Sequence, residues 1–127
     1  QSTQWRLYFP HSRTDLDPAN NITTVVFHEV EMRATAGGGD QCTGGSASAS
    51  SVGVGAGGSA NNAFDNDTST SAWWSSSVGT IGGAEWLQYT FATSVTVREL
   101  WLLFFSKNNL PTEIDVQYWD GSAWVTW

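Results

Sequence analysis

Apolar and polar residues alternate over short stretches of this chain, and no stretch repeats apolar residues at the spacing of an amphipathic helix. Alternation is typical of strands with one buried face, and the Gly, Asn, Pro and Asp residues between the stretches are typical of turns. Six or seven short strands joined by turns predict an all-β fold, an antiparallel β-sandwich. The predicted strands cover residues 5–9, 25–33, 47–52, 86–91, 95–105 and 114–118, with a hairpin turn at Asp120-Gly121 before Trp124.

Three of these stretches carry finer expectations. In residues 25–33, His28 lies on the face that we expect to point into the core, and Glu29 lies on the opposite face. Residues 95–105 are mostly apolar, which predicts a central strand covered on both faces. Residues 47–52 lie in a stretch rich in Gly and Ser, which we interpret as a strand of small residues rather than a flexible linker.

Length and charge narrow the class of protein. With 127 residues, the chain has room for one domain with one core, residues 1–127. It starts at Gln1 without Met, so we expect a processed chain or a piece of a longer polypeptide. Twelve acidic residues against five scattered basic ones give a net charge of −7, which argues against a nucleic-acid partner. A single cysteine excludes an internal disulfide, and no apolar run is long enough for membrane insertion.

The turn at residues 62–70 is the stretch with the most informative chemistry. Oxygen-bearing side chains recur there at one- and two-residue spacing around the apolar Phe64. Several oxygens that converge from one tight loop suit a hard cation such as Ca²⁺. The alternative is a metal-free turn in which Asp65 and Asp67 cap backbone N–H groups. Glu29 distinguishes the two, because a carboxylate that faces the turn from a distant strand is costly unless a cation neutralises the cluster.

Three motifs, in order along the chain, resemble those of discoidin domains, which are also called coagulation factor 5/8 type C domains. Residues 63–67 with Thr70 and Trp73 are similar to the A-F-D-G-N-x-x-T-x-W core of that family. Residues 86–91 are similar to its W-L-Q-V-D-L strand, and residues 111–124 to its hairpin with D-G-x-x-W. The resemblance implies a galactose-binding-like jelly roll.

The order of the segments differs from the usual one. Residues 5–7 and 27–32 resemble segments that normally end a discoidin domain, so the chain resembles a circularly permuted member. Its opening looks like those of domains attached to phage tail, fibre and other virion proteins. The resemblance therefore implies a virion or extracellular location and a homo-oligomeric assembly.

The resemblance also implies a structural Ca²⁺ in the acidic turn. Carried over residue by residue, its ligands are the carbonyls of Asn62 and His28 and the side chains of Glu29, Asp65, Asp67 and Thr70.

Two sets of residues are candidates for ligand binding. Trp73 and Trp74 lie among serines, where each can be either part of the core or a platform for a sugar ring. The second set is a rim of polar residues from two loops, His11, Arg13, Lys107, Asn108 and Asn109.

No nucleophile elbow, zinc-protease motif or phosphate loop occurs in the sequence, so we do not expect an enzyme. The expected function is a non-catalytic module of a virion protein that binds carbohydrate on a cell surface. The alternative is a structural virion module that contacts other virion subunits without binding glycan.

Overall fold

The computed structural model describes residues 1–10, 24–53, 58–69, 72–74, 84–106, 110–111 and 113–127. Most of the regular structure in these residues is β-strand. No helix in the described ranges is long and apolar enough to cross a membrane. The elements in chain order are β1 (Ser2–Phe9), β2 (Val26–Arg33), β3 (Ser46–Ala49), the 3₁₀ turn η2 (Ala60–Ala63), β4 (Trp73–Trp74), β5 (Glu85–Val95), β6 (Glu99–Phe104), β7 (Asp115–Trp119) and β8 (Trp124–Thr126).

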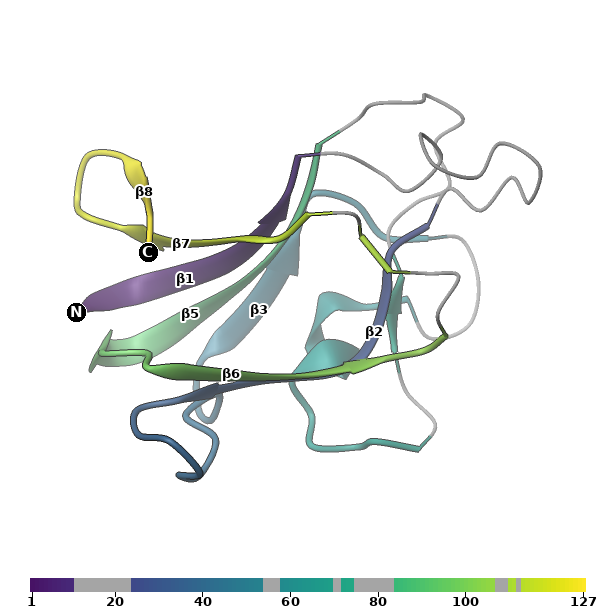
Figure 1. Ribbon diagram of the computed structural model, residues 1–127, viewed down its shortest axis with the longest axis horizontal. Helices are drawn as coiled ribbons and strands as arrows, with labels where there is room; N and C mark the ends of the chain where they lie inside the picture. Colours follow the sequence, from purple (N-terminus) through teal and green to yellow (C-terminus); the bar gives the residue numbers. More distant parts are fainter. Residues whose placement is uncertain (11–23, 54–57, 70–71, 75–83, 107–109, 112) are drawn as a thin grey trace.

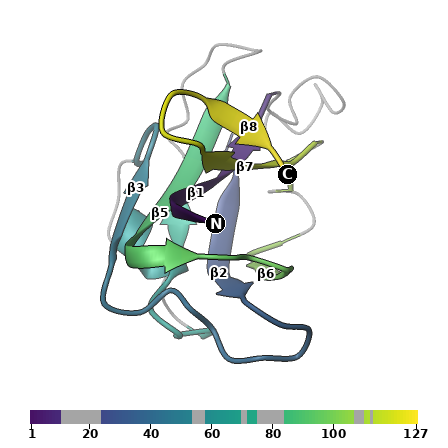
Figure 2. The same cartoon turned by 90° about the vertical axis from the view of Figure 1, so that its left-hand side faces the viewer.

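The strands form two antiparallel sheets that face each other across the core (Figures 1 and 2). The larger sheet has the order β3-β5-β1-β7-β8, and the smaller has the order β4-β2-β6. The prediction of an all-β antiparallel sandwich is confirmed. Both N-terminal strands are central: β1 lies between β5 and β7, and β2 lies between β4 and β6.

Alternation in β1 decides which side chains of the larger sheet reach the core. Trp5, Leu7 and Phe9 are buried, whereas the residues between them are only half-buried. The cross-strand partners follow the same rule, because Leu7 lies opposite Leu87 on one side and Val116 on the other. The side chains of Arg6 and Tyr8 therefore lie on the outer face of the sheet.

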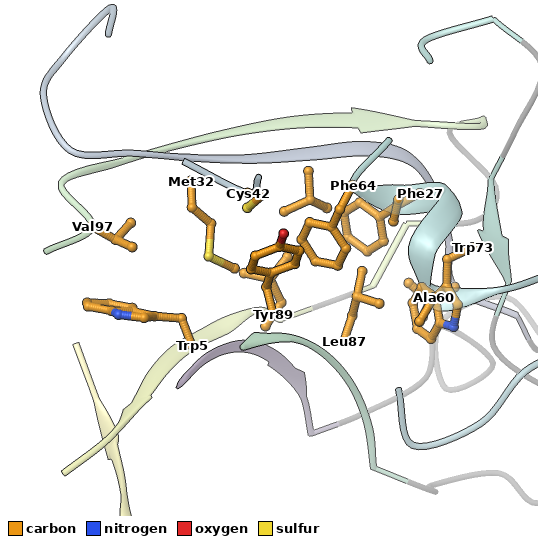
Figure 3. Close-up of a cluster of buried hydrophobic side chains, with 14 of the residues drawn as sticks. Trp5, Phe27, Met32, Cys42, Ala60, Phe64, Trp73, Leu87, Tyr89 and Val97 are labelled. Atoms are coloured by element: carbon orange, nitrogen blue, oxygen red, sulfur yellow. The ribbon is translucent and has the colours of Figure 1, made fainter. Parts of the chain in front are cut away.

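Aromatic rings fill the space between the sheets (Figure 3). Trp5, Leu87 and Tyr89 point from the larger sheet towards Phe27 and Met32 of the smaller one. Each fully buried side chain of this size contributes about 2 kcal/mol of burial free energy, so the core accounts for the main stabilising term.

A β-bulge interrupts β2. Phe27 pairs with Phe104, but Glu29 pairs with Leu103, so β2 contains one extra residue at His28. The bulge shifts the alternation, and the expectation that His28 points inward is wrong. Its ring is half-buried and lies 5.3 Å from the ring of the exposed Phe105. After the bulge, Val30 and Met32 point into the core.

The expectation of one central strand over residues 95–105 is also wrong. The chain leaves β5 at Val95 and starts β6 at Glu99, which is the edge strand of the smaller sheet. Leu100, Leu102 and Phe104 pack against the core, whereas Trp101 and Leu103 belong to the other face. The apolar run thus has one covered face and one half-exposed face.

The hairpin at Asp120 forms as predicted. Trp119 lies opposite Trp124, and Asp120 Oδ1 accepts hydrogen bonds from the N–H groups of Ser122 and Ala123. Gly121 has a φ of 110°, a left-handed value that residues with a Cβ avoid. The strand pairing, the two hydrogen bonds and the φ of Gly121 place Trp119 and Trp124 side by side on one face.

Candidate functional site

Carboxylates complete the edge of β2 that lies beyond its short pairing with β4. The strand β4 pairs only with Val26 and Phe27. Further along β2, the N–H of Val30 donates to Oε1 of Glu29 at 3.2 Å, and the N–H of Met32 donates to Oδ1 of Asp40 at 3.0 Å. Acidic side chains therefore accept from two N–H groups at this edge, next to the backbone bridge between Arg33 and Asp40.

Glu29 is the centre of this acidic cluster, and its side chain has no solvent exposure. Its Oε2 has no hydrogen-bond partner in the described ranges, and the same holds for the buried Oδ2 of Asp40. Burial, followed by the nearby charge of Asp65, raises the pKa of Glu29 to about 7. A buried carboxylate oxygen without a hydrogen-bond partner lowers the stability of the fold. A bound cation would satisfy Oε2 of Glu29.

The acidic turn lies directly against Glu29, although the two are far apart in sequence. The short helix η2 and the buried Phe64 anchor the start of the turn, and Asn66 adopts a left-handed φ of 60°. The N–H of Asn66 and the carboxylate of Asp65 both act on Glu29. The bulge in β2 and the left-handed turn thus bring the two segments together. The resemblance assigned Glu29 to this cluster, and its role as a metal ligand stays a prediction.

The turn also contains the hydrogen bonds expected of a metal-free turn. Asp65 Oδ1 accepts from the N–H of Asp67 at 2.9 Å, and Asp67 Oδ1 accepts from the N–H of Ser69 at 2.8 Å. These bonds use one oxygen of each carboxylate and define the turn shape. They leave Oε2 of Glu29 without a hydrogen-bond partner in the described ranges, so this atom distinguishes a calcium site from a metal-free turn.

The donor set fits a hard cation in its chemistry. Asp65 is close enough to Glu29 to contribute to the raised pKa of Glu29, and Ca²⁺ accepts carboxylate and carbonyl oxygens in flexible geometry. Within the described residues no group of three or more His, Cys, Asp and Glu side chains is arranged around one metal position, so backbone carbonyls and water would have to complete the shell. The Asn62 side chain donates to the Ala72 carbonyl at 3.3 Å and fixes the turn to β4, and Thr70 lies outside the described residues.

Trp73 is not available for ligand binding, which corrects that assignment. The side chain is fully buried, its ring stacks with Phe9 at 6.2 Å and Phe27 at 6.3 Å, and its Nε1 donates to the Ser51 carbonyl. It belongs to the core, the alternative that the sequence left open. In β4, the backbone of Trp74 pairs with Val26 of β2, and its side chain is not among the described parts of the structure. The polar rim, which comprises His11, Arg13, Lys107, Asn108 and Asn109, also lies outside the described residues.

The structure brings together a second group that the sequence analysis missed, on the outer face of the larger sheet. Cross-strand pairing places Tyr8 opposite Trp86, Arg6 opposite Gln117, and Trp119 opposite Trp124. All of these side chains except the buried Gln117 are half-buried. We call this group the aromatic face; it comprises Arg6, Tyr8, Trp86, Gln117, Trp119 and Trp124. Alternation could have assigned each residue to an outer face, but only the strand order shows that they are neighbours.

Comparisons with known protein families, with characterised proteins and with solved structures found no match for this chain. The fold and the two groups of residues above therefore carry the functional argument by themselves.

Proposed function

We propose that this domain is a non-catalytic carbohydrate-binding module, held in shape by a structural Ca²⁺ and displayed on a virion appendage or another extracellular assembly. The observation that carries the proposal is the aromatic face. It offers tryptophan and tyrosine rings beside amide and guanidinium groups on a rigid sheet, the combination that sugar recognition uses. The virion setting rests on the resemblance to discoidin-type domains alone.

Rigid position supports this role. Trp119 and Trp124 contact each other edge to face at 5.6 Å, and the hairpin hydrogen bonds of Asp120 hold the turn between them. Ring platforms on paired strands lose little conformational entropy when a sugar ring stacks on them. Gln88 and Gln117 flank Arg6 on the same face, and amide side chains can both donate to and accept from sugar hydroxyls.

The proposed Ca²⁺ has a structural role in this scheme. Glu29 and Asp65 would hold it, with carbonyl oxygens of the acidic turn, and the ion would neutralise the two carboxylates. It supplies charge compensation and takes part in no reaction. The aromatic face is on the opposite side of the core from β2, so the ion would act on sugar binding only through the stability of the domain.

A glycan array tests the proposal with a matched pair of tryptophan variants. Trp124→Ala removes a ring from the aromatic face, and Trp101→Ala removes one from the half-exposed face of β6. We expect sugar binding by the wild type and Trp101→Ala and at least tenfold weaker binding by Trp124→Ala, since one stacked ring contributes about 1–3 kcal/mol in comparable stacking contacts. Binding to no glycan, with or without calcium, would contradict the proposal.

A structural module that contacts neighbouring virion subunits is the second candidate. Trp101 and Leu103 are half-exposed on the outer face of β6, and Phe105 follows them with an exposed fraction of 53%. Exposed apolar groups on an edge strand favour contact with another chain. Sedimentation velocity separates the candidates: self-association that Trp101→Ala abolishes, together with a blank glycan array, would favour the structural role.

A further inference from the structure

Arg6 occupies the centre of the aromatic face, on the middle strand of the larger sheet. Its Nε donates to Oε1 of Gln117 at 2.7 Å. The guanidinium carbon lies 4.1 Å from the ring centre of Trp124 and 5.1 Å from that of Tyr8, both within cation–π range. Three separate contacts from three strands therefore fix the plane of the guanidinium.

No acidic side chain neutralises Arg6 in the described part of the chain. The ion pairs found there join Arg33 to Glu31 at 2.7 Å and to Glu99 at 2.8 Å. Asp115 shares the aromatic face, opposite Tyr8, but forms no ion pair with Arg6. In a chain with twelve acidic residues against five basic ones, a fixed arginine without a carboxylate partner is unexpected if its role is structural.

The geometry defines which part of Arg6 a ligand could use. Because Gln117 occupies Nε, the two terminal nitrogens remain as a parallel pair of donors. Such a pair matches the two oxygens of a carboxylate, in a bidentate and charge-assisted hydrogen bond. Trp124 and Tyr8 lie beside the same group, so a ring attached to that carboxylate would meet an aromatic surface.

From this arrangement we infer that the aromatic face binds a carboxylated sugar, with the carboxylate on the terminal nitrogens of Arg6 and the sugar ring on the flanking aromatic rings. The inference rests on the proposed carbohydrate-binding function and specifies its ligand. Sialic acids and uronic acids share this chemistry. Burial lowers the pKa of Arg6, which is consistent with a cation held partly out of water and available to a negative partner.

Isothermal titration with matched acidic and neutral ligands tests the inference. One pair is tri-galacturonic acid and its methyl ester, and the other is 3′-sialyllactose and lactose; all titrations use the intact 127-residue chain with calcium present. The wild type should bind at least one acidic member roughly tenfold or more tightly than its neutral counterpart, because a charge-assisted bidentate contact is lost in the latter. The pair that shows the preference identifies the source of the carboxylate.

Three variants assign the preference to Arg6. Arg6→Met removes the charge and keeps an apolar stem, so it should bind the acidic ligand no better than the neutral one. Arg6→Lys keeps the charge without the paired donors and should retain only part of the preference. Arg98→Met removes the same charge from an exposed position between β5 and β6 and should bind as the wild type does.

The outcomes separate this inference from the proposed function. If neutral glycans bind and Arg6→Met leaves every affinity unchanged, the carboxylate assignment is overturned while the carbohydrate-binding function stands. If the wild type binds neither acidic nor neutral ligands, both are overturned. A loss of preference in Arg98→Met equal to that in Arg6→Met would show a general charge effect and would also overturn the assignment.

Discussion

Among the described residues, Glu29 and Arg6 are two ionisable groups without an opposite charge beside them, yet their surroundings differ. Glu29 is fully buried with other acids nearby, and Arg6 is half-buried among aromatic rings on the far side of the core. Where this fold uses charge to connect segments, it pairs the groups, as Arg33 does with Glu31 and Glu99. This difference agrees with the two proposals above, in which Glu29 binds a cation and Arg6 binds an anionic ligand.

Calcium and pH should produce the two largest effects, of similar size, and both test the Glu29 half of the comparison. At a calcium concentration a hundred times the dissociation constant, binding would add about 2.7 kcal/mol to the free energy of unfolding. For a domain of this size, that corresponds to a rise in Tm of roughly 10 °C. Asp65→Ala and EDTA should each remove this rise, and together they should do no more than either alone. Calorimetry of the two proteins with calcium and with EDTA measures it.

Asp120→Ala is the matched control for that experiment. Asp120 caps backbone N–H groups in a turn as Asp65 does, but it lies in the β7–β8 hairpin, away from Glu29. Its loss should lower Tm equally with and without calcium. Equal melting of the wild type in calcium and in EDTA would refute the metal site.

The pH dependence of the calcium-free protein should give an effect of about the same size as calcium. The pKa of Glu29 is raised from 4.5 to about 7 in the folded protein, so the unfolded chain releases the proton first as pH rises. The stability that depends on the neutral form is complete below about pH 4.5 and is lost as pH rises through 7. The loss amounts to roughly 3 kcal/mol. Urea denaturation in EDTA at several pH values measures it.

Two variants of neighbouring glutamates on β2 show whether Glu29 is responsible. Glu29→Gln should flatten the profile between pH 5 and 8 and should be more stable than the wild type at pH 8 in EDTA. Glu31→Gln, which removes a partner of Arg33, should keep the slope of the wild type. A flat wild-type profile over this range would show that Glu29 is not strained by burial.

Arg6→Met should have the smallest effect on stability of all these changes. It tests the Arg6 half of the comparison. The variant loses cation–π contacts that contribute about 1 kcal/mol, and it loses the hydrogen bond from Nε to the buried Gln117, which contributes about 1 kcal/mol more. It keeps an apolar side chain against Trp124. We expect Tm to fall by several degrees, less than the change that calcium produces. A fall of 10 °C or more would instead assign Arg6 a structural role and weaken the case for an anionic ligand.

The sequence predicted more of the fold than of the site, and the reason lies in which relationships are local. Alternation in residues 5–9 and the Asp120-Gly121 turn depend on near neighbours, so both could be predicted. The bulge at His28 depends on pairing with β6, which is distant in sequence, so the residues around His28 do not predict it. Glu29 was selected through a resemblance rather than through its own surroundings.

The aromatic residues show the same limit. Trp73 and Trp124 are the same residue type in similarly polar stretches, but one is fully buried and the other half-exposed. Only the strand order distinguishes them, since Trp73 lies against Phe9 and Phe27, and Trp124 lies against Arg6 from the opposite face of β1. Pairing over long sequence separations decides function here, and composition does not reveal it.

The central place of β1 has a consequence for how the chain acquires its structure. The strand β1 is synthesised before its two partners, β5 and β7, which come from the second half of the 127 residues. The larger sheet therefore cannot close until most of the chain has been synthesised. We expect slow folding, because the contact order is high. Until β5 and β7 have been synthesised, the apolar side chains of β1 are exposed and can aggregate with other chains.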